Sequence, residues 1–222
     1  MTAYVLRPAP VAPSGAVVFI PGLGNRTSMV PGWKDAGLPV TALVRRRPQD
    51  DLDLTERGAE IARLIADAGL DEVTLLGHSL GGLVAFETAR HLADRVARVV
   101  VVAQYPPHVM HRYTDEEIEA SALPELEAGL APELREVPDF VDVARSIWRS
   151  DLRAVARYRT DATISVPLRA VGARSDGKSR EGPLLAEWAR YTERPVETVV
   201  VDGGHNDIET LSASGLRTWM GS

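Results

Sequence analysis

The pentapeptide Gly77–Gly81 (Gly-His-Ser-Leu-Gly) joins two apolar segments with no residues to spare. The run Val73–Leu76 predicts a buried strand, and Gly82–Leu92 predicts a helix, so the chain must reverse direction within five residues. Such a turn strains the central serine and lets the flanking backbones pass closely only if the residues two before and two after it are small. The motif therefore demands a strand–turn–helix unit.

The rest of the chain alternates in the same way, and this alternation predicts an α/β fold with a mostly parallel central sheet and helices on both faces. Further strands are predicted at Val17–Ile20, Val40–Val44, Val99–Val102, Leu168–Val171 and Val196–Val201. Further helices are predicted at Asp53–Ala68, Glu181–Arg190 and Ile208–Met220, the last of them broken or frayed near Gly215.

One segment interrupts the alternation, because no strand is predicted between about residues 105 and 163. Capping-box spacing at Thr114 and Glu117 and the helical period between Val141 and Tyr158 indicate a mainly helical insertion. It is too short to be a comfortable independent domain. We expect it to form a lid over the carboxyl edge of the sheet, within a single domain that spans residues 1–222.

Composition excludes several classes of protein. The 222 residues contain no cysteine, which excludes disulfides, thiolate metal sites and a cysteine nucleophile. A net charge of −6 gives no electrostatic footprint for nucleic acid. The longest apolar run, Val99–Ala103, is far too short to span a membrane, and Met1–Ser14 lacks the apolar core of a secretory signal. We therefore expect a cytoplasmic protein.

Ser79 is the predicted nucleophile, because the turn presents its hydroxyl at a helix N-terminus, where backbone N–H groups stabilise negative charge. A serine nucleophile needs a general base. His205 is the predicted base, since it follows the strand Val196–Val201 through a glycine-containing loop and reaches the same sheet edge. The other histidines are His78 within the turn, a packing or turn residue by this interpretation, His91 at the end of the helix, and His108 and His111 in the insertion.

Asp176 is the predicted carboxylate that orients the base. It follows the strand Leu168–Val171 by a short loop, which completes the chain order Ser79, Asp176, His205. Asp202 and Asp207 are the alternatives, although Asp202 stands very close to His205 in the sequence.

Two backbone N–H groups are expected to form an oxyanion hole. One belongs to Leu80, the residue after the predicted nucleophile. The other is assigned to Leu23, in the glycine-rich segment that follows the strand Val17–Ile20; a plain tight turn is the alternative.

Together these residues resemble the α/β-hydrolase superfamily and, within it, the stand-alone type II thioesterases of polyketide and nonribosomal peptide synthesis. The superfamily resemblance rests on Ile20–Gly24, Gly77–Gly81, Asp176 and Gly204-His205. The narrower one rests on Ala85–Leu92 and, in the insertion, on Leu134, Pro138, Ser150–Ala154 and Tyr158-Arg159. The chain differs from the family's pattern at Asn206-Asp207, where aromatic residues usually follow the histidine.

The resemblance implies an α/β-hydrolase fold and a serine hydrolase that removes acyl groups from the phosphopantetheine arm of carrier proteins, with no metal and no other cofactor. The alternatives are a carboxylesterase or lipase acting on oxygen esters, an acyltransferase or cyclase, and a non-catalytic binding module on the same fold. The insertion residues Trp148, Leu152, Val155 and Tyr158 would line an acyl pocket or form ordinary helix core.

An acyl or peptidyl carrier protein is the implied partner. Carrier proteins are typically acidic and this chain is also acidic, so attraction would need a local basic patch. Two clusters are candidates: Arg45–Arg47, and the group Arg149, Arg153, Arg157 and Arg159 in the insertion. The alternative is that nearby acids such as Asp50, Asp51 and Asp151 pair with them.

Overall fold

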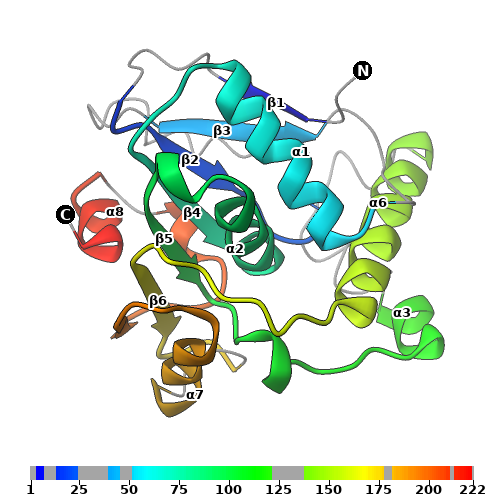
Figure 1. Ribbon diagram of the computed structural model, residues 1–222. Helices are drawn as coiled ribbons and strands as arrows, with labels where there is room; N and C mark the ends of the chain where they lie inside the picture. The colour runs from blue at the N-terminus through cyan, green and yellow to red at the C-terminus, as the bar shows by residue number, and fades with distance from the viewer. Residues whose placement is uncertain are drawn as a thin grey trace.

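The computed structural model describes residues 4–7, 14–24, 40–45, 52–121, 138–177, 182–210 and 213–221. Within these residues a seven-stranded sheet has the order β1-β3-β2-β4-β5-β6-β7 (Figure 1). The strands are β1 (Tyr4–Arg7), β2 (Val17–Ile20), β3 (Val40–Arg45), β4 (Val73–His78), β5 (Val96–Val102), β6 (Leu168–Ala173) and β7 (Val196–Val201). Strand β1 pairs antiparallel with β3, and all other neighbours are parallel. The mostly parallel α/β sheet predicted from the sequence is confirmed.

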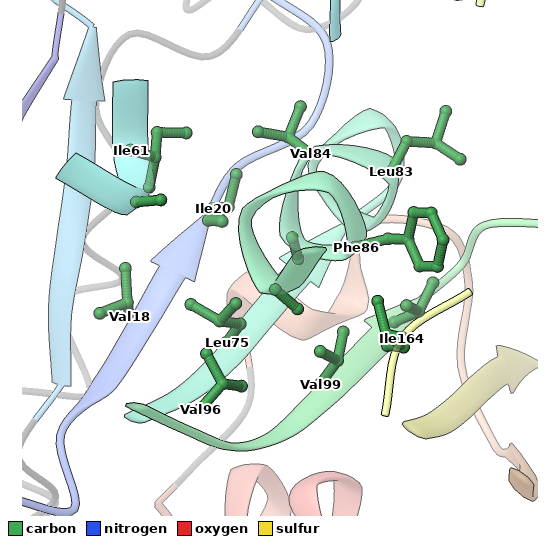
Figure 2. Close-up of a cluster of buried hydrophobic side chains, with 14 of the residues drawn as sticks. Val18, Ile20, Ile61, Leu75, Leu83, Val84, Phe86, Val96, Val99 and Ile164 are labelled. Atoms are coloured by element: carbon green, nitrogen blue, oxygen red, sulfur yellow. The ribbon is translucent and has the colours of Figure 1, made fainter. Parts of the chain in front are cut away.

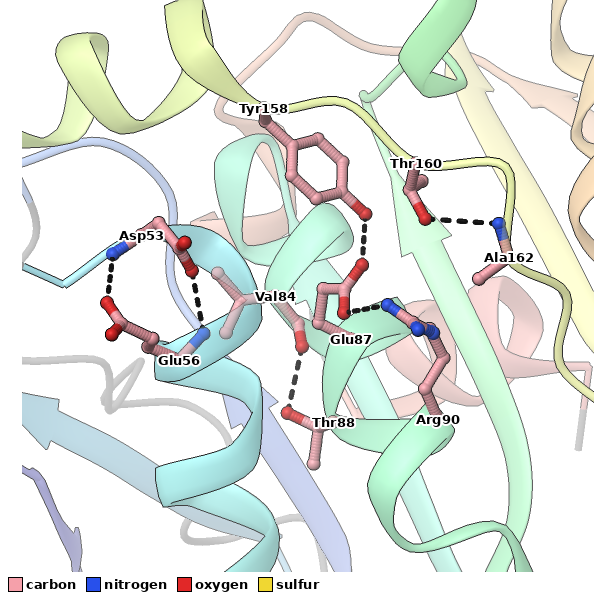
Figure 3. Close-up of polar contacts among 9 residues, drawn as sticks. All are labelled: Asp53, Glu56, Val84, Glu87, Thr88, Arg90, Tyr158, Thr160 and Ala162. Carbon is pink, nitrogen blue, oxygen red and sulfur yellow. Dashed lines mark hydrogen bonds and ion pairs between the residues drawn. The ribbon is translucent and has the colours of Figure 1, made fainter.

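The described α-helices are α1 (Leu54–Asp67), α2 (Leu80–His91), α3 (Asp115–Ser121), α6 (Pro138–Arg157), α7 (Gly182–Ala186) and α8 (Ala213–Met220). Helix α1 begins with a capping box, in which Asp53 Oδ1 accepts from the Glu56 N–H at 2.8 Å and the Asp53 N–H donates to Glu56 Oε2 at 2.9 Å (Figure 3). The helix ends before Gly69, which has the positive φ that favours glycine there.

Two apolar layers cover the two faces of the sheet, because successive strand residues point to opposite sides. In β2, Val18 and Ile20 face helices α1 and α2, whereas Val17 and Phe19 face helix α8. Figure 2 shows the first layer, where Phe86 of α2 lies over the sheet. The second layer is completed by Ile208, Leu216, Trp219 and Met220. This double burial holds the strand ends, and therefore the loops that carry the site, in fixed relative positions.

The ends of the elements differ from the sequence-based bounds at several points. Helix α2 begins at Leu80, two residues earlier than predicted, because Ser79 alone makes the chain reversal. The predicted helix Glu181–Arg190 is α7 followed by the 3-10 helix Glu187–Tyr191. The predicted helix Ile208–Met220 is a 3-10 turn, Asp207–Thr210, followed by α8. Gly215 lies inside α8, so the helix is not broken at that residue; residues 211 and 212, between the two elements, lie outside the described residues.

The insertion is represented by α3, α6 and the segments beside them, whereas residues 122–137, with the motif residue Leu134, lie outside the described residues. The capping box at the start of α3 forms as predicted, with the Thr114 N–H donating to Glu117 Oε2 at 2.7 Å. Val155 of α6 and Tyr158, which follows the last residue of that helix, belong to the core layer that faces α2. Core packing is thus the correct interpretation of these two residues. No helix in the described parts of the chain is long and apolar enough to cross a bilayer.

Candidate active site

The turn between β4 and α2 holds Ser79 in a strained conformation, with φ +52° and ψ −128°. Its N–H donates to the Val102 carbonyl of the neighbouring strand at 2.8 Å, and its own carbonyl accepts from the Gly82 N–H at 2.8 Å. A non-glycine residue in such a region costs about 1–3 kcal/mol and persists only where its surroundings impose it. The serine hydroxyl is thus fixed above the carboxyl edge of the sheet.

Gly77 and Gly81 are required here for steric reasons. A Cβ at Gly77 would collide with the main chain of Gly81 and Gly82, and a Cβ at Gly81 would collide with the carbonyl oxygens of Ile20 and Pro21. The small residues that the sequence predicted two positions either side of the serine are therefore explained by backbone contact on both sides.

The loops after β6 and β7 bring Asp176 and His205 to the same edge. The Ser175 N–H donates to the Gly203 carbonyl at 2.8 Å, and the Arg174 N–H donates to the Val201 carbonyl at 2.9 Å. These two bonds tie the loops together, so that residues 29 positions apart in the chain become neighbours.

Asp176, His205 and Ser79 form a continuous chain of hydrogen bonds. His205 Nδ1 lies 2.9 Å from Asp176 Oδ2, and His205 Nε2 lies 3.1 Å from Ser79 Oγ. An ionised carboxylate only accepts, so Nδ1 carries the proton and Nε2 is free to accept from the serine hydroxyl. The Asp176 side chain is 3% exposed and that of His205 is 28% exposed. A buried acid thus orients a ring that substrate and water can reach.

The two alternative acids occupy other positions. Asp202 pairs with Arg174 at 2.8 Å, and its side chain is 92% exposed. Asp207 Oδ2 accepts from the Gly204 N–H at 2.9 Å, which shapes the loop that carries His205. Asp176 is the acid that the fold brings to Nδ1 of His205.

The segment Pro21–Gly24 runs beside Ser79, where the sequence predicted an oxyanion donor. A Cβ at Gly22 would meet Ser79 Cβ at 3.1 Å, so only a residue without a side chain fits beside the serine there. Leu80, as the first residue of α2, has an N–H with no acceptor inside the helix. Leu23 is half-buried in the turn. The donor roles of Leu23 and Leu80 stay predictions.

His78 has a contact that the sequence did not indicate. The residue is 3% exposed, and its Nε2 donates to the main-chain carbonyl of His205 at 2.7 Å. The two rings lie 5.1 Å apart between centroids. Burial, and next the proximity of His205, lower the pKa of His78 to about 4, against the opposing influence of its hydrogen bond and of Asp176. His78 is therefore a neutral donor that braces the loop of His205.

The lowered pKa of His78 makes folding stability sensitive to acid. The unfolded chain takes up a proton on this ring near pH 6.5 and the folded chain only near pH 4, so stability falls as pH drops through that window. Between pH 8 and pH 5 the loss is about 2 kcal/mol from this group alone. We expect His78→Gln, which keeps an N–H donor but does not titrate, to lose correspondingly less stability over that range. Urea unfolding at the two pH values measures the difference, with His91→Gln at an exposed position as the control. Equal losses in the native and His78→Gln chains would contradict the assignment.

Two arginines of the insertion are paired. Arg149 and Arg153 both contact Glu119 of α3, at 2.5 Å and 3.2 Å. The acid partner is thus Glu119, whereas the expected partner Asp151 is buried and pairs with Arg57 at 2.5 Å. In the other predicted cluster, Arg46 and Arg47 lie outside the described residues. Because Glu119 offsets part of their charge, Arg149 and Arg153 are weaker candidates for a basic docking patch.

A small pocket adjoins the Pro21–Gly24 segment on the side of α2. It is lined by Tyr4, Ile20, Pro21, Gly22, Leu43, Leu80 and Val84. The insertion residues predicted as pocket lining are absent from this described pocket.

Among the described residues, no group of three or more histidine, aspartate or glutamate side chains is placed to hold a metal ion.

The sheet, the strained turn after β4 and the placement of Asp176 and His205 after β6 and β7 are those of the α/β-hydrolase class. Two solved structures share the fold: YbtT, the type II thioesterase of the yersiniabactin pathway (TM-score 0.77, 21% identity, 98% of this chain and 96% of that one), and RedJ, a thioesterase of prodiginine biosynthesis in Streptomyces coelicolor (TM-score 0.74, 22% identity, 95% and 85%). At these identities the likeness shows the fold alone.

Comparison of the sequence with known proteins gives the family within this fold class. The family model described as the thioesterase domain matches residues 41–215. The chain belongs to the thioesterase domain family. It is 28% identical over 177 residues to thioesterase PikA5 of Streptomyces venezuelae, covering 72% of this chain and 60% of that protein. It is 32% identical over 143 residues to phenyloxazoline synthase MbtB of Mycobacterium tuberculosis, covering 60% of this chain and 10% of that protein. The matched part thus spans less than two thirds of these relatives.

Proposed function

We propose that the protein is a serine hydrolase that cleaves acyl thioesters, with Ser79 as the nucleophile, His205 as the general base and Asp176 as the group that orients it. The observation that carries the proposal is the hydrogen-bond chain from Asp176 Oδ2 through both ring nitrogens of His205 to Ser79 Oγ. Membership of the thioesterase family supports the choice of a thioester as the bond that is broken.

In the proposed reaction, Ser79 Oγ attacks the acyl carbonyl while its proton passes to His205 Nε2. The carbonyl oxygen becomes an oxyanion, held by the N–H groups of Leu80 and Leu23. The C–S bond then breaks, the thiol leaves with the proton from His205, and an acyl-serine ester remains. Water repeats the sequence, giving up its proton to His205 and releasing the carboxylic acid and free Ser79. The buried carboxylate of Asp176 stabilises the charged imidazole at each step.

Acyl groups carried on the phosphopantetheine arm of a carrier protein are the proposed substrate class. The support is the resemblance at Ser150–Ala154 and Ala85–Leu92, together with similar proteins whose names place them in biosynthetic pathways: YbtT in a yersiniabactin NRPS/PKS pathway, and the probable anguibactin biosynthesis thioesterase of Vibrio anguillarum, 22% identical over 149 residues. An esterase acting on oxygen esters remains the alternative function, since it would use the same residues.

A matched pair of substrates tests the substrate class. We expect the kcat/KM for an acyl group on a carrier-bound phosphopantetheine arm to exceed that for the same acyl group on the corresponding oxygen ester by at least about tenfold. The reason is that binding energy from the arm and carrier is used at the reacting carbonyl. Higher activity on the oxygen ester would favour the esterase. A fluorophosphonate probe that fails to label Ser79 would instead indicate a binding module.

A further inference from the structure

Two residues of helix α6, Trp148 and Asp151, contact Gly24 at the end of the segment Pro21–Gly24. Asp151 Oδ2 accepts from the Gly24 N–H at 3.0 Å. One turn earlier, the ring of Trp148 lies so close to Gly24 that a Cβ there would come within 2.7 Å of Trp148 Cε3. Gly24 has a φ of +70°, a conformation that favours glycine, so both the shape and the small size of this residue fit the contact.

The carboxylate of Asp151 is itself held in place. Its Oδ1 lies 2.5 Å from Arg57 Nη1 of helix α1, and both side chains are fully buried. Arg57 is fixed in turn, because its Nε donates to the Leu52 carbonyl at 3.1 Å and its Nη2 to Ser150 Oγ at 3.3 Å. A buried ion pair is weak evidence for a stabilising role, because the cost of removing two ions from water can exceed the gain from their attraction. A positioning role is the alternative explanation.

These contacts bear on the active site because the same segment lies beside Ser79. A Cβ at Gly22 would come within 3.1 Å of Ser79 Cβ and 3.3 Å of His78 Nδ1, while the Gly24 N–H two residues later donates to Asp151 Oδ2. The N–H of Leu23 lies between these two fixed points. The orientation of the Leu23 peptide therefore depends on where α6 holds Gly24.

We propose that Asp151 and Trp148 are positioning residues, which set the Leu23 N–H as an oxyanion donor and so couple the seating of helix α6 to catalysis. This inference rests on the function proposed above. In this arrangement the buried Arg57–Asp151 pair keeps one carboxylate oxygen aimed at the loop, and displacement of α6 by a bound partner or substrate would alter the oxyanion hole directly.

A matched pair of double variants tests the proposal without leaving a lone buried charge. Arg57→Met with Asp151→Asn removes the ion pair but keeps an amide oxygen that can accept from the Gly24 N–H. Arg57→Met with Asp151→Leu removes the acceptor as well. We expect the leucine variant to show a kcat about 10- to 100-fold below the asparagine variant, with KM changed less than about threefold, because an oxyanion donor acts in the transition state.

A second measurement separates positioning from loss of stability. Phenylboronic acid forms a tetrahedral adduct on an active serine and places an anionic oxygen in the oxyanion hole. Its inhibition constant should rise in the leucine variant by about the same factor as kcat falls. Tyr158→Phe provides the control, at the residue that directly follows α6: it removes the hydrogen bond from Tyr158 to the buried Glu87 of α2, a bond that does not involve the Pro21–Gly24 segment (Figure 3). That variant should melt at a lower temperature with an unchanged boronic acid constant.

The possible outcomes are distinct. If both double variants fold and share the same kcat and inhibition constant, the positioning role is wrong. If the leucine variant does not fold, Trp148→Ala replaces it, since Trp148 is only partly buried and its removal leaves the ion pair intact; a kcat and inhibition constant equal to those of the native chain would then overturn the proposal. If the Ser79→Ala variant hydrolyses thioesters as fast as the native chain does, the proposed function itself is wrong.

Discussion

Replacing Ser79 with alanine is expected to lower turnover by about 10³- to 10⁶-fold while the chain still folds. Alanine keeps the Cβ and therefore the same strained backbone at φ +52°, so only the hydroxyl is lost. Without it no acyl-enzyme forms, and the residual rate comes from binding and from the oxyanion donors. The measurement is kcat on an acyl thioester, with circular dichroism to check the fold.

Ser175→Ala serves as the control for this variant. Ser175 is an exposed serine at the same edge of the sheet, and the contact that ties its loop is made by its main-chain N–H. Its loss should leave turnover within a few-fold of the native value. Turnover within tenfold of native in the folded Ser79→Ala protein would end the assignment of Ser79 as the nucleophile.

The second large effect is expected at Asp176, where replacement by asparagine should lower kcat by about 10³- to 10⁴-fold. The amide fits the same buried space but loses the charge that stabilises the imidazolium. It can also turn its NH₂ toward Nδ1, which moves the ring proton to Nε2 and removes the acceptor for Ser79 Oγ.

Asp202→Asn and Asp207→Asn are the matched controls for the acid. Asp202 is exposed and pairs with Arg174, so its loss should change kcat less than about threefold. Asp207 holds the Gly204 N–H, so its amide variant should have a moderate effect through the shape of the loop. If Asp207→Asn is crippling and Asp176→Asn is mild, the role of the orienting acid moves to Asp207.

Local patterns in the sequence were sufficient for most of the fold. Strands β2 and β7 begin and end at the predicted residues, since β-branched runs bounded by turn residues have little alternative. The errors lie at element ends. Gly215 suggested a break because glycine weakens helices, yet it lies inside α8, whose Leu216 and Trp219 pack under the sheet and outweigh that weak preference.

The residues of the hydrogen-bond chain could also be predicted from the sequence. Ser79, Asp176 and His205 each follow a predicted strand directly or by a short loop, and the carboxyl ends of parallel strands meet at one edge. Once the sheet is parallel, the order of the motifs places them together. The loop lengths also favoured Asp176 over Asp202, because a residue three positions before His205 cannot easily curl back to its ring.

Only the tertiary structure shows the contacts between residues that are far apart in the sequence, because no local sequence pattern predicts them. His78 reaches the His205 carbonyl across 127 residues, and Asp151 reaches Gly24 across the same separation. The sequence led us to expect Asp151 among the acids that pair with the insertion's exposed arginines, but Asp151 and Arg57 are fully buried against each other. The sequence by itself determined which elements form and where the reactive side chains stand along them, because those follow from short-range periodicity and turn geometry. The hydrogen bond from His78 to the His205 loop and the contact of Asp151 with the segment Pro21–Gly24 depend on how helices pack over a sheet, and that packing is fixed only when the whole core assembles.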